Sequence, residues 1–216
     1  MRKAIIASGI AIALLATVGM ARADSLYVGS SYTYPIHIVD NGVQKTVGGG
    51  SIDPSTLNGT LLKYMYCINP DLEISAGTTY ANTIVTTNGV IGGTPGHGVT
   101  NAGQIAWLLG NYGTGGQGAN AYALQVAIWH EEDSTITMDT FHSTAQEIGL
   151  YNSYLSSLGG NTGNVSDFLW ITPQNSCGQI FQEQVGAVPE PPTLLLLGTC
   201  LAVFAALRLK ARQAKG

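Results

Sequence analysis

The spacing of apolar and polar positions divides the chain into a β-like first half and a helical middle. Tyr32, Tyr34, Ile36 and Ile38 alternate with polar residues, and the turn sequence "DNG" follows them, which predicts a β-hairpin. Two further β-like stretches come before the Gly-rich loop at 88–98. They are "TLLKYMYCI" at 60–68, which stops before Pro70, and "TTYANTIVTT" at 78–87.

After residue 100 the apolar positions recur at helical spacing. Ile105, Leu108, Leu109 and Tyr112 predict a first helix, capped by Thr100 or Asn101. A second helix fits 119–133, Asp139 is the expected cap of a third that ends at Leu158, and "DFLWIT" and "QIFQEQV" predict two closing strands. This order predicts an α+β domain, a β-sheet or sandwich with a helical insertion of about three helices.

Residues 1–23 have the features of a secretory signal peptide. Arg2 and Lys3 precede an apolar run that ends at Gly19, and Ala21 and Ala23 form a small-x-small cleavage site. We therefore expect cleavage after Ala23 and a mature ectodomain over residues 24–187.

The last residues, 188–216, combine three different segments. A Pro-rich motif of Val188, Pro189, Glu190 and Pro191 precedes an apolar segment at 193–207 and a basic tail at 208–216. The apolar segment has 15 residues, the short limit for one hydrophobic helix that enters the membrane, and the basic tail favours a cytoplasmic end.

This tripartite tail resembles the PEP-CTERM sorting signal of Gram-negative bacteria. "VPEP" corresponds to the motif, and "TLLLLG" to the leucine-rich start of the apolar segment. The resemblance implies an exosortase as partner, cleavage near Pro189–Pro191 after passage through the inner membrane, and delivery to the outer surface or an extracellular matrix. An ordinary tail anchor is the alternative.

Charge excludes one class of partner. All 13 acidic residues lie between Asp24 and Glu190, where Lys45 and Lys63 are the only basic residues, so this region has a formal charge of −11. Such a surface repels phosphate backbones, so nucleic acid is not an expected partner. Low charge density with many Gly, Asn, Thr and Ser residues is consistent with a secreted matrix protein.

Gln125 is the one polar residue in the apolar run from Ala121 to Trp129. That helix should be buried on nearly all sides, and an unpaired amide there costs about 1–3 kcal/mol. A core Gln bonded to neighbouring backbone is one solution. A thioester is another: the Cys67 thiol attacks the carboxamide carbon, ammonia leaves, and the apolar surroundings exclude water.

Three stretches resemble the thioester domains of bacterial surface adhesins: "YCI" at 66–68, "QIAWLLGNY" at 104–112 and "ALQVAIW" at 123–129. Leu124 stands where that family has Thr before the Gln. The resemblance implies a Cys67–Gln125 thioester sheltered by Tyr66, Leu124, Ile128 and Trp129. It also implies covalent capture of a surface amine or hydroxyl, on a protein Lys or a polysaccharide, by an adhesin that needs no cofactor.

Other chemistry competes for the same residues. A disulfide between Cys67 and Cys177 would prevent the thioester and leave a passive envelope or biofilm protein, and two free thiols are the third state. Gln104 is a rival acyl partner on a helix that is less sealed.

An enzyme and a metal site have weaker support in the sequence. A Cys–His hydrolase formed with His97, His130 or His142 lacks an oxyanion-hole motif, so we do not expect an enzyme. Consecutive residues in "HEED" at 130–133 point in different directions, which predicts a solvated helix end rather than a metal site.

Overall fold

The computed structural model describes residues 23–92 and 96–188. Its largest element is an antiparallel sheet with the strand order β5-β4-β1-β7-β11-β12-β6. The strands are β1 (Asp24–Tyr27), β4 (Thr56–Leu57), β5 (Thr60–Leu61), β6 (Met65–Cys67), β7 (Thr79–Thr86), β11 (Phe168–Thr172) and β12 (Gln184–Ala187). The predicted closing strands are therefore both present, although the second begins five residues later than "QIFQEQV".

A second sheet contains the predicted hairpin. Strands β2 (Ser31–Asp40) and β3 (Val43–Asp53) pair around Asn41 and Gly42, whose φ angles are 49° and 79°. Positive φ at both turn residues is the reason for the Asn-Gly sequence. Strand β10 (Ile136–Met138) pairs with the other edge of β2, and a small ladder joins β8 (Val90–Ile91) to β9 (His97–Gly98).

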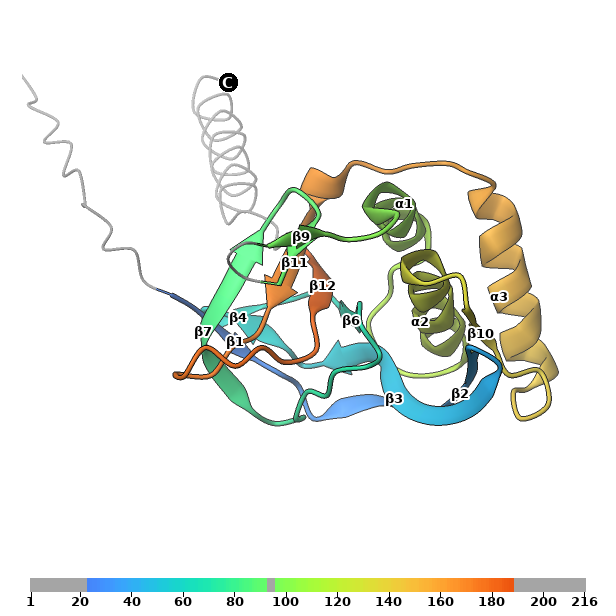
Figure 1. Cartoon of the computed structure of the whole chain (residues 1–216), viewed down its shortest axis with the longest axis horizontal. Coiled ribbons are helices and arrows are strands. Elements are labelled where there is room, and N and C mark those ends of the chain that lie inside the picture. The colour runs from blue at the N-terminus through green and yellow to red at the C-terminus, as the bar shows by residue number, and fades with distance from the viewer. Residues whose placement is uncertain (1–22, 93–95, 189–216) are drawn as a thin grey trace, which may run out of the picture.

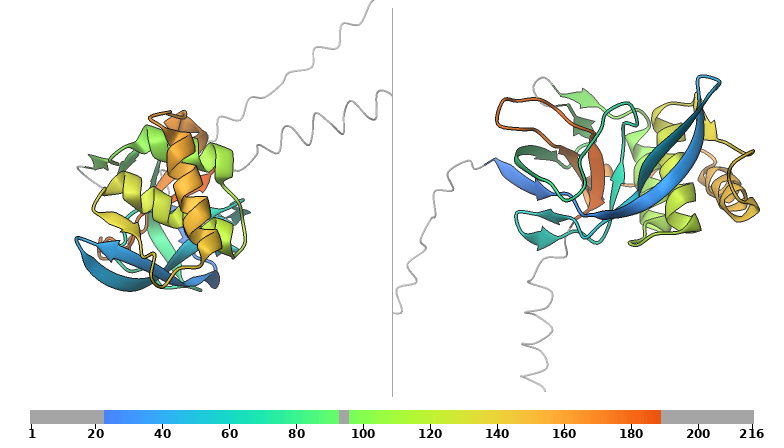
Figure 2. Two further views of the ribbon diagram at one scale, coloured as in Figure 1. Left: turned by 90° about the vertical axis from the view of Figure 1, so that its right-hand side faces the viewer. Right: turned by 90° about the horizontal axis from the view of Figure 1, so that it is seen from below.

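Three helices lie to one side of the large sheet, and the long β2–β3 hairpin extends from the sheet to the helices (Figure 1 and Figure 2). They are α1 (Ala102–Tyr112), α2 (Ala119–Glu132) and α3 (Ala145–Leu158), and a short 3₁₀ helix, η1 (Val165–Asp167), precedes β11. Helix α2 packs between the other elements and contacts α1, α3, β3 and β6. A β-rich domain with three helices inserted between its strands confirms the coarse fold prediction.

Two local predictions were wrong, and a third was right in position only. Helix α3 begins after Thr144, whose side chain accepts from the Glu147 N–H in a capping box, while Asp139 instead accepts from the His142 ring at 2.6 Å. Asn101 is the N-cap residue of α1, but its side chain makes no capping hydrogen bond, and its amide donates to the carbonyl of Glu131 at 3.1 Å. The single strand expected over 60–68 is divided into β5 and β6, because β5 turns back onto β4.

Both sorting segments lie outside the described residues. They are the signal peptide through Arg22, with Ala21 of its cleavage site, and the tail from Pro189, with its motif, its apolar segment and its basic end. Over residues 23–92 and 96–188, the structure contains no helix with the length and hydrophobicity needed to span a membrane.

Candidate functional site at Cys67 and Gln125

Gln125 lies on a helix that is buried nearly all round, as the sequence predicts. Ten of the residues of α2 are buried, and the exposed fraction of Gln125 is 0%. Such a helix offers the carboxamide no solvent, so the amide needs partners from other elements.

Those partners come from Cys67 and Gly50. The Gln125 Oε1 atom accepts from the Cys67 N–H at 3.0 Å and from the Gly50 N–H at 3.1 Å, and Nε2 donates to the Cys67 carbonyl at 2.7 Å. The two residues that the sequence pairs, 58 positions apart, therefore meet in the core.

Strand geometry explains why Cys67 presents its backbone to α2. Cys67 lies opposite Gln184 of β12, and the neighbouring Ile68 N–H donates to the Glu183 carbonyl at 2.8 Å. Cys67 and Gln184 are therefore a non-hydrogen-bonded pair, in which backbone groups point away from the partner strand and side chains approach closely. Because β6 is an edge strand, the Gln125 amide continues the ladder beyond it.

Gln184 is a site residue that sequence reasoning missed. Its side chain is fully buried, its Nε2 donates to the Gln182 carbonyl at 3.0 Å, and its Oε1 has no partner among the described residues. A glutamine that follows Gln182 and Glu183 carries no local sign of burial. Only its register opposite Cys67 identifies it.

The Cys67 thiol is almost fully buried. Its exposed fraction is 1%, and burial raises the pKa of this thiol to about 12, although an interaction with the Gln184 side chain opposes the shift. A thiol with that pKa is almost entirely protonated at neutral pH, so it is unreactive toward solution reagents.

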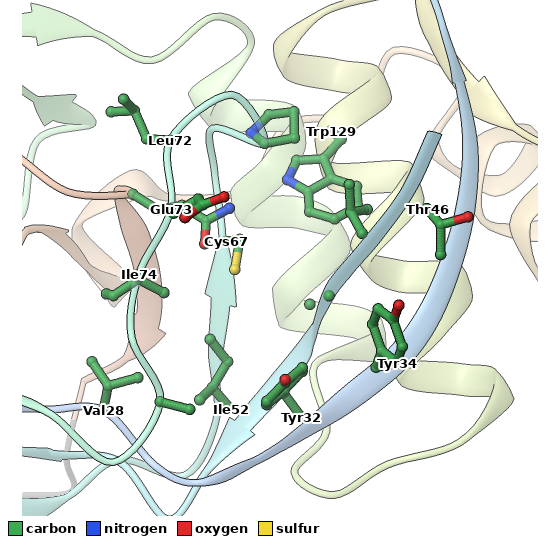
Figure 3. A pocket seen from close by; sticks show the side chains of 16 residues that line it. Val28, Tyr32, Tyr34, Thr46, Ile52, Cys67, Leu72, Glu73, Ile74 and Trp129 are labelled. Atoms are coloured by element: carbon green, nitrogen blue, oxygen red, sulfur yellow. The ribbon is translucent and has the colours of Figure 1, made fainter. Parts of the chain in front are cut away.

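The Cys67 side chain points into a cavity of about 380 Å³ (Figure 3). Trp129, Gly49 and Ile52 line the cavity, and Tyr32, Tyr34 and Glu73 are also part of its lining. The Trp129 indole is fully buried, and its Nε1 has no hydrogen-bond partner among the described residues.

Close approach of β3 to α2 depends on Gly49. A Cβ atom at this position would lie 2.9 Å from Gln125 Cγ and 3.1 Å from the Trp129 ring. Both distances are shorter than ordinary carbon–carbon contacts, so a side chain here would displace the carboxamide. The absence of side chains at 48–50 thus leaves space for the cavity and for the Gln125 carboxamide.

The four residues expected to shelter the bond are all in the core. Tyr66, Leu124, Ile128 and Trp129 each have an exposed fraction of 0%. Trp129 is the one of these four that lines the cavity, and Tyr66 donates its hydroxyl proton to the Thr114 carbonyl at 2.8 Å.

The rival partners lie elsewhere. Gln104 is half-buried on α1, which packs against α2, α3 and η1. Cys177 is exposed in a turn held by the Asn175 side chain, and the structure has Cys67 and Cys177 as free thiols, so the alternative disulfide is not formed in it.

The histidines bond to groups other than the thiol. The His130 ring contacts the Ile136 carbonyl at 2.7 Å, His142 bonds to Asp139, and His97 lies exposed in β9. No hydrogen bond joins a histidine to Cys67 within the part of the chain that the structure describes, so no Cys–His pair is assembled there.

The end of α2 is less solvated than the "HEED" pattern predicts. Glu131 has an exposed fraction of 9%, and one oxygen of Glu132 is buried without a partner among the described residues. Burial raises the pKa of Glu132 from 4.5 to about 7. The described ranges contain no group of three or more His, Cys, Asp or Glu residues placed to hold a metal ion.

Glu132 should make the stability depend on pH. Its raised pKa means that the native state binds more protons than the unfolded chain between about pH 4.5 and 7, so the free energy of unfolding falls as pH rises through this window. Glu132→Gln cannot ionise, so we expect urea denaturation of this variant to show a smaller fall, by about 1 kcal/mol. Glu73→Gln, at an exposed position, is the control, and an unchanged slope for Glu132→Gln would contradict the burial argument.

Comparison with known families gives one match, at the C-terminus. Residues 187–211 match the PEP-CTERM protein-sorting motif, in agreement with the resemblance seen in the sequence. The match supports an exported protein that an exosortase sorts to the cell envelope of a Gram-negative bacterium. Neither the curated proteins nor the solved structures gave a match. The likeness of the ectodomain to adhesin thioester domains therefore stays a prediction.

Proposed function

We propose that this exosortase-sorted protein is a surface adhesin that captures a nucleophilic partner through a Cys67–Gln125 thioester. The single observation that carries the proposal is the position of the Gln125 carboxamide, which bonds to both the N–H and the carbonyl of Cys67. Delivery to the outer surface or an extracellular matrix would place this group where partners are found.

Bond formation needs no reagent beyond the two side chains. The thiol sulfur adds to the Gln125 carbonyl carbon, the carbon–nitrogen bond breaks, and the thiol proton leaves with the nitrogen as ammonia. Burial supports the product rather than the thiolate, because a thioester has no ionisable group and a buried site solvates a charge poorly. The protonated state of the free thiol makes the step slow once the core has closed.

Capture of a partner breaks the bond between the Gln125 acyl carbon and the Cys67 sulfur. A partner's amine or hydroxyl, on a protein Lys or a polysaccharide, attacks the same carbonyl carbon. The new amide or ester bond forms, and the Cys67 sulfur leaves with the proton as a thiol. Each molecule reacts once, so the protein is a single-use tether rather than an enzyme.

A passive envelope or biofilm component is the second candidate. Three hydrogen bonds already satisfy the Gln125 amide without any covalent change, which favours a structural role for the same residues. The two candidates differ in whether the Gln125 carbonyl carbon can be attacked.

Isotopically labelled methylamine tests the proposal on the natively exported ectodomain. We expect one methylamine per chain, located by peptide mass spectrometry at Gln125 and not at Gln104 or Gln184. Uptake at Gln104 or Gln184 would show that Gln125 is not the acyl partner. If a folded sample takes up no methylamine, the covalent proposal is rejected and the passive envelope or biofilm component is favoured.

A further inference from the structure

The mouth of the cavity beside Cys67 has two exposed aromatic side chains. Tyr32 and Tyr34, two residues apart on β2, have exposed fractions of 44% and 67%. Both residues line the cavity, in a stretch of β2 whose pairing with β3 is irregular on either side of Thr33. Figure 3 shows both rings at the cavity, opposite the loop that carries Leu72 and Ile74.

Strand β3 supports the first of these rings. A Cβ atom on Gly48 would lie 2.8 Å from Cε2 and 3.1 Å from Cδ2 of Tyr32, so one edge of this ring lies against the glycine backbone. The contact restrains the ring, and 44% of the residue stays exposed. A rigid aromatic surface of this kind binds at a low cost in conformational entropy.

The polar lining is uncharged or acidic. Glu73 is exposed at the cavity, and Gln182 and Thr46 add amide and hydroxyl groups. No Lys or Arg among the described residues lines the cavity, and the region from Asp24 to Glu190 carries 13 acidic residues against two lysines. An anionic ligand would be repelled, so a bound molecule must be neutral or cationic.

The volume of the cavity distinguishes between neutral and cationic ligands. A cavity of about 380 Å³ is within the range for pockets that bind small organic molecules. An alkylammonium group fills only a small part of it. A sugar ring fills more, stacks its apolar face on tyrosine, and offers hydroxyls that donate to Glu73 and Gln182 and accept from tyrosine hydroxyls.

We propose that this cavity is a binding site for a neutral sugar unit of a polysaccharide, with Tyr32 and Tyr34 as its stacking surface. The binding is non-covalent and does not depend on the thioester. It would hold a matrix polysaccharide at the protein whether or not Gln125 reacts.

Titration calorimetry of the ectodomain tests the site with cellotetraose, chitotetraose and mannotetraose, and with tetragalacturonate and methylammonium as charged comparisons. We expect millimolar or tighter binding of at least one neutral oligosaccharide and none of tetragalacturonate. Tyr34→Ala should weaken that binding about tenfold or more, because it removes most of one stacking surface. Phe141→Ala, at a side chain 84% exposed outside the cavity lining, is the matched control.

Methylamine uptake, measured separately on the wild-type ectodomain, keeps this test distinct from the proposed capture reaction. Three results would overturn the proposal: no binding of any neutral oligosaccharide, binding of methylammonium alone, or equal loss in Tyr34→Ala and Phe141→Ala. Sugar binding without methylamine uptake would uphold this site and reject the covalent function.

Discussion

Cys67→Ala is expected to abolish methylamine uptake at Gln125 completely. An unactivated carboxamide does not exchange with amines under mild conditions, so uptake requires the Cys67 sulfur as leaving group. The variant keeps the backbone N–H and carbonyl that bind Gln125, because these groups do not depend on the side chain. Native mass spectrometry after incubation with methylamine measures the effect.

Cys177→Ala is the matched control for that experiment. Cys177 is an exposed thiol outside the cavity lining, so we expect this variant to take up methylamine as the wild type does. Uptake that persists in Cys67→Ala would show that a different residue activates the carbonyl. Loss of uptake in both variants would instead favour a role for both cysteines.

Gln125→Leu is expected to lower the free energy of unfolding by about 3 kcal/mol or more. The substitution keeps the side chain close to its original size but leaves three buried backbone groups without partners: the N–H groups of Gly50 and Cys67 and the Cys67 carbonyl. Each such group costs about 1–3 kcal/mol when it stays unsatisfied. Urea denaturation in a Cys67→Ala background measures this cost without a contribution from a covalent bond.

Gln104→Leu, made in the same background, is the control for chemistry and size. Gln104 is half-buried and its side chain has no partner among the described contacts of α1, so we expect a change below about 1 kcal/mol. Equal effects of the two substitutions would show that the Gln125 hydrogen bonds contribute little.

Much of the fold could be predicted because local signals agreed with it. The "DNG" turn, the alternation in β2 and the helical period in α1 each specify an element within a short window. The burial of Gln125 was predictable for the same reason, because every neighbour on its helix is apolar.

Features that depend on tertiary contacts could not be predicted. Asp139 looks like a helix cap in the sequence, yet its carboxylate bonds to His142 and the helix begins at Ala145. Glu131 reads as a solvated residue, but the packing of α2 buries it. In each case a contact made by the folded chain replaces solvent around a polar group.

The site itself was predicted only in part. Cys67 and Gln125 were expected to join through the Cys67 sulfur. The hydrogen bonds of Gln125 are to the Cys67 backbone, and the sulfur–acyl bond stays a prediction. Gln184 was missed because its position depends on the pairing of β12 with β6, which no local pattern reports. The cavity was missed because it depends on the glycine run of β3 passing close to α2.

The intact mass of the mature, natively folded ectodomain tests the central claim most directly. A sulfur–acyl bond between strand β6 and helix α2 predicts a chain that is lighter than its sequence by one ammonia. A mass equal to that of the sequence, or one lower by two hydrogens, would contradict the account.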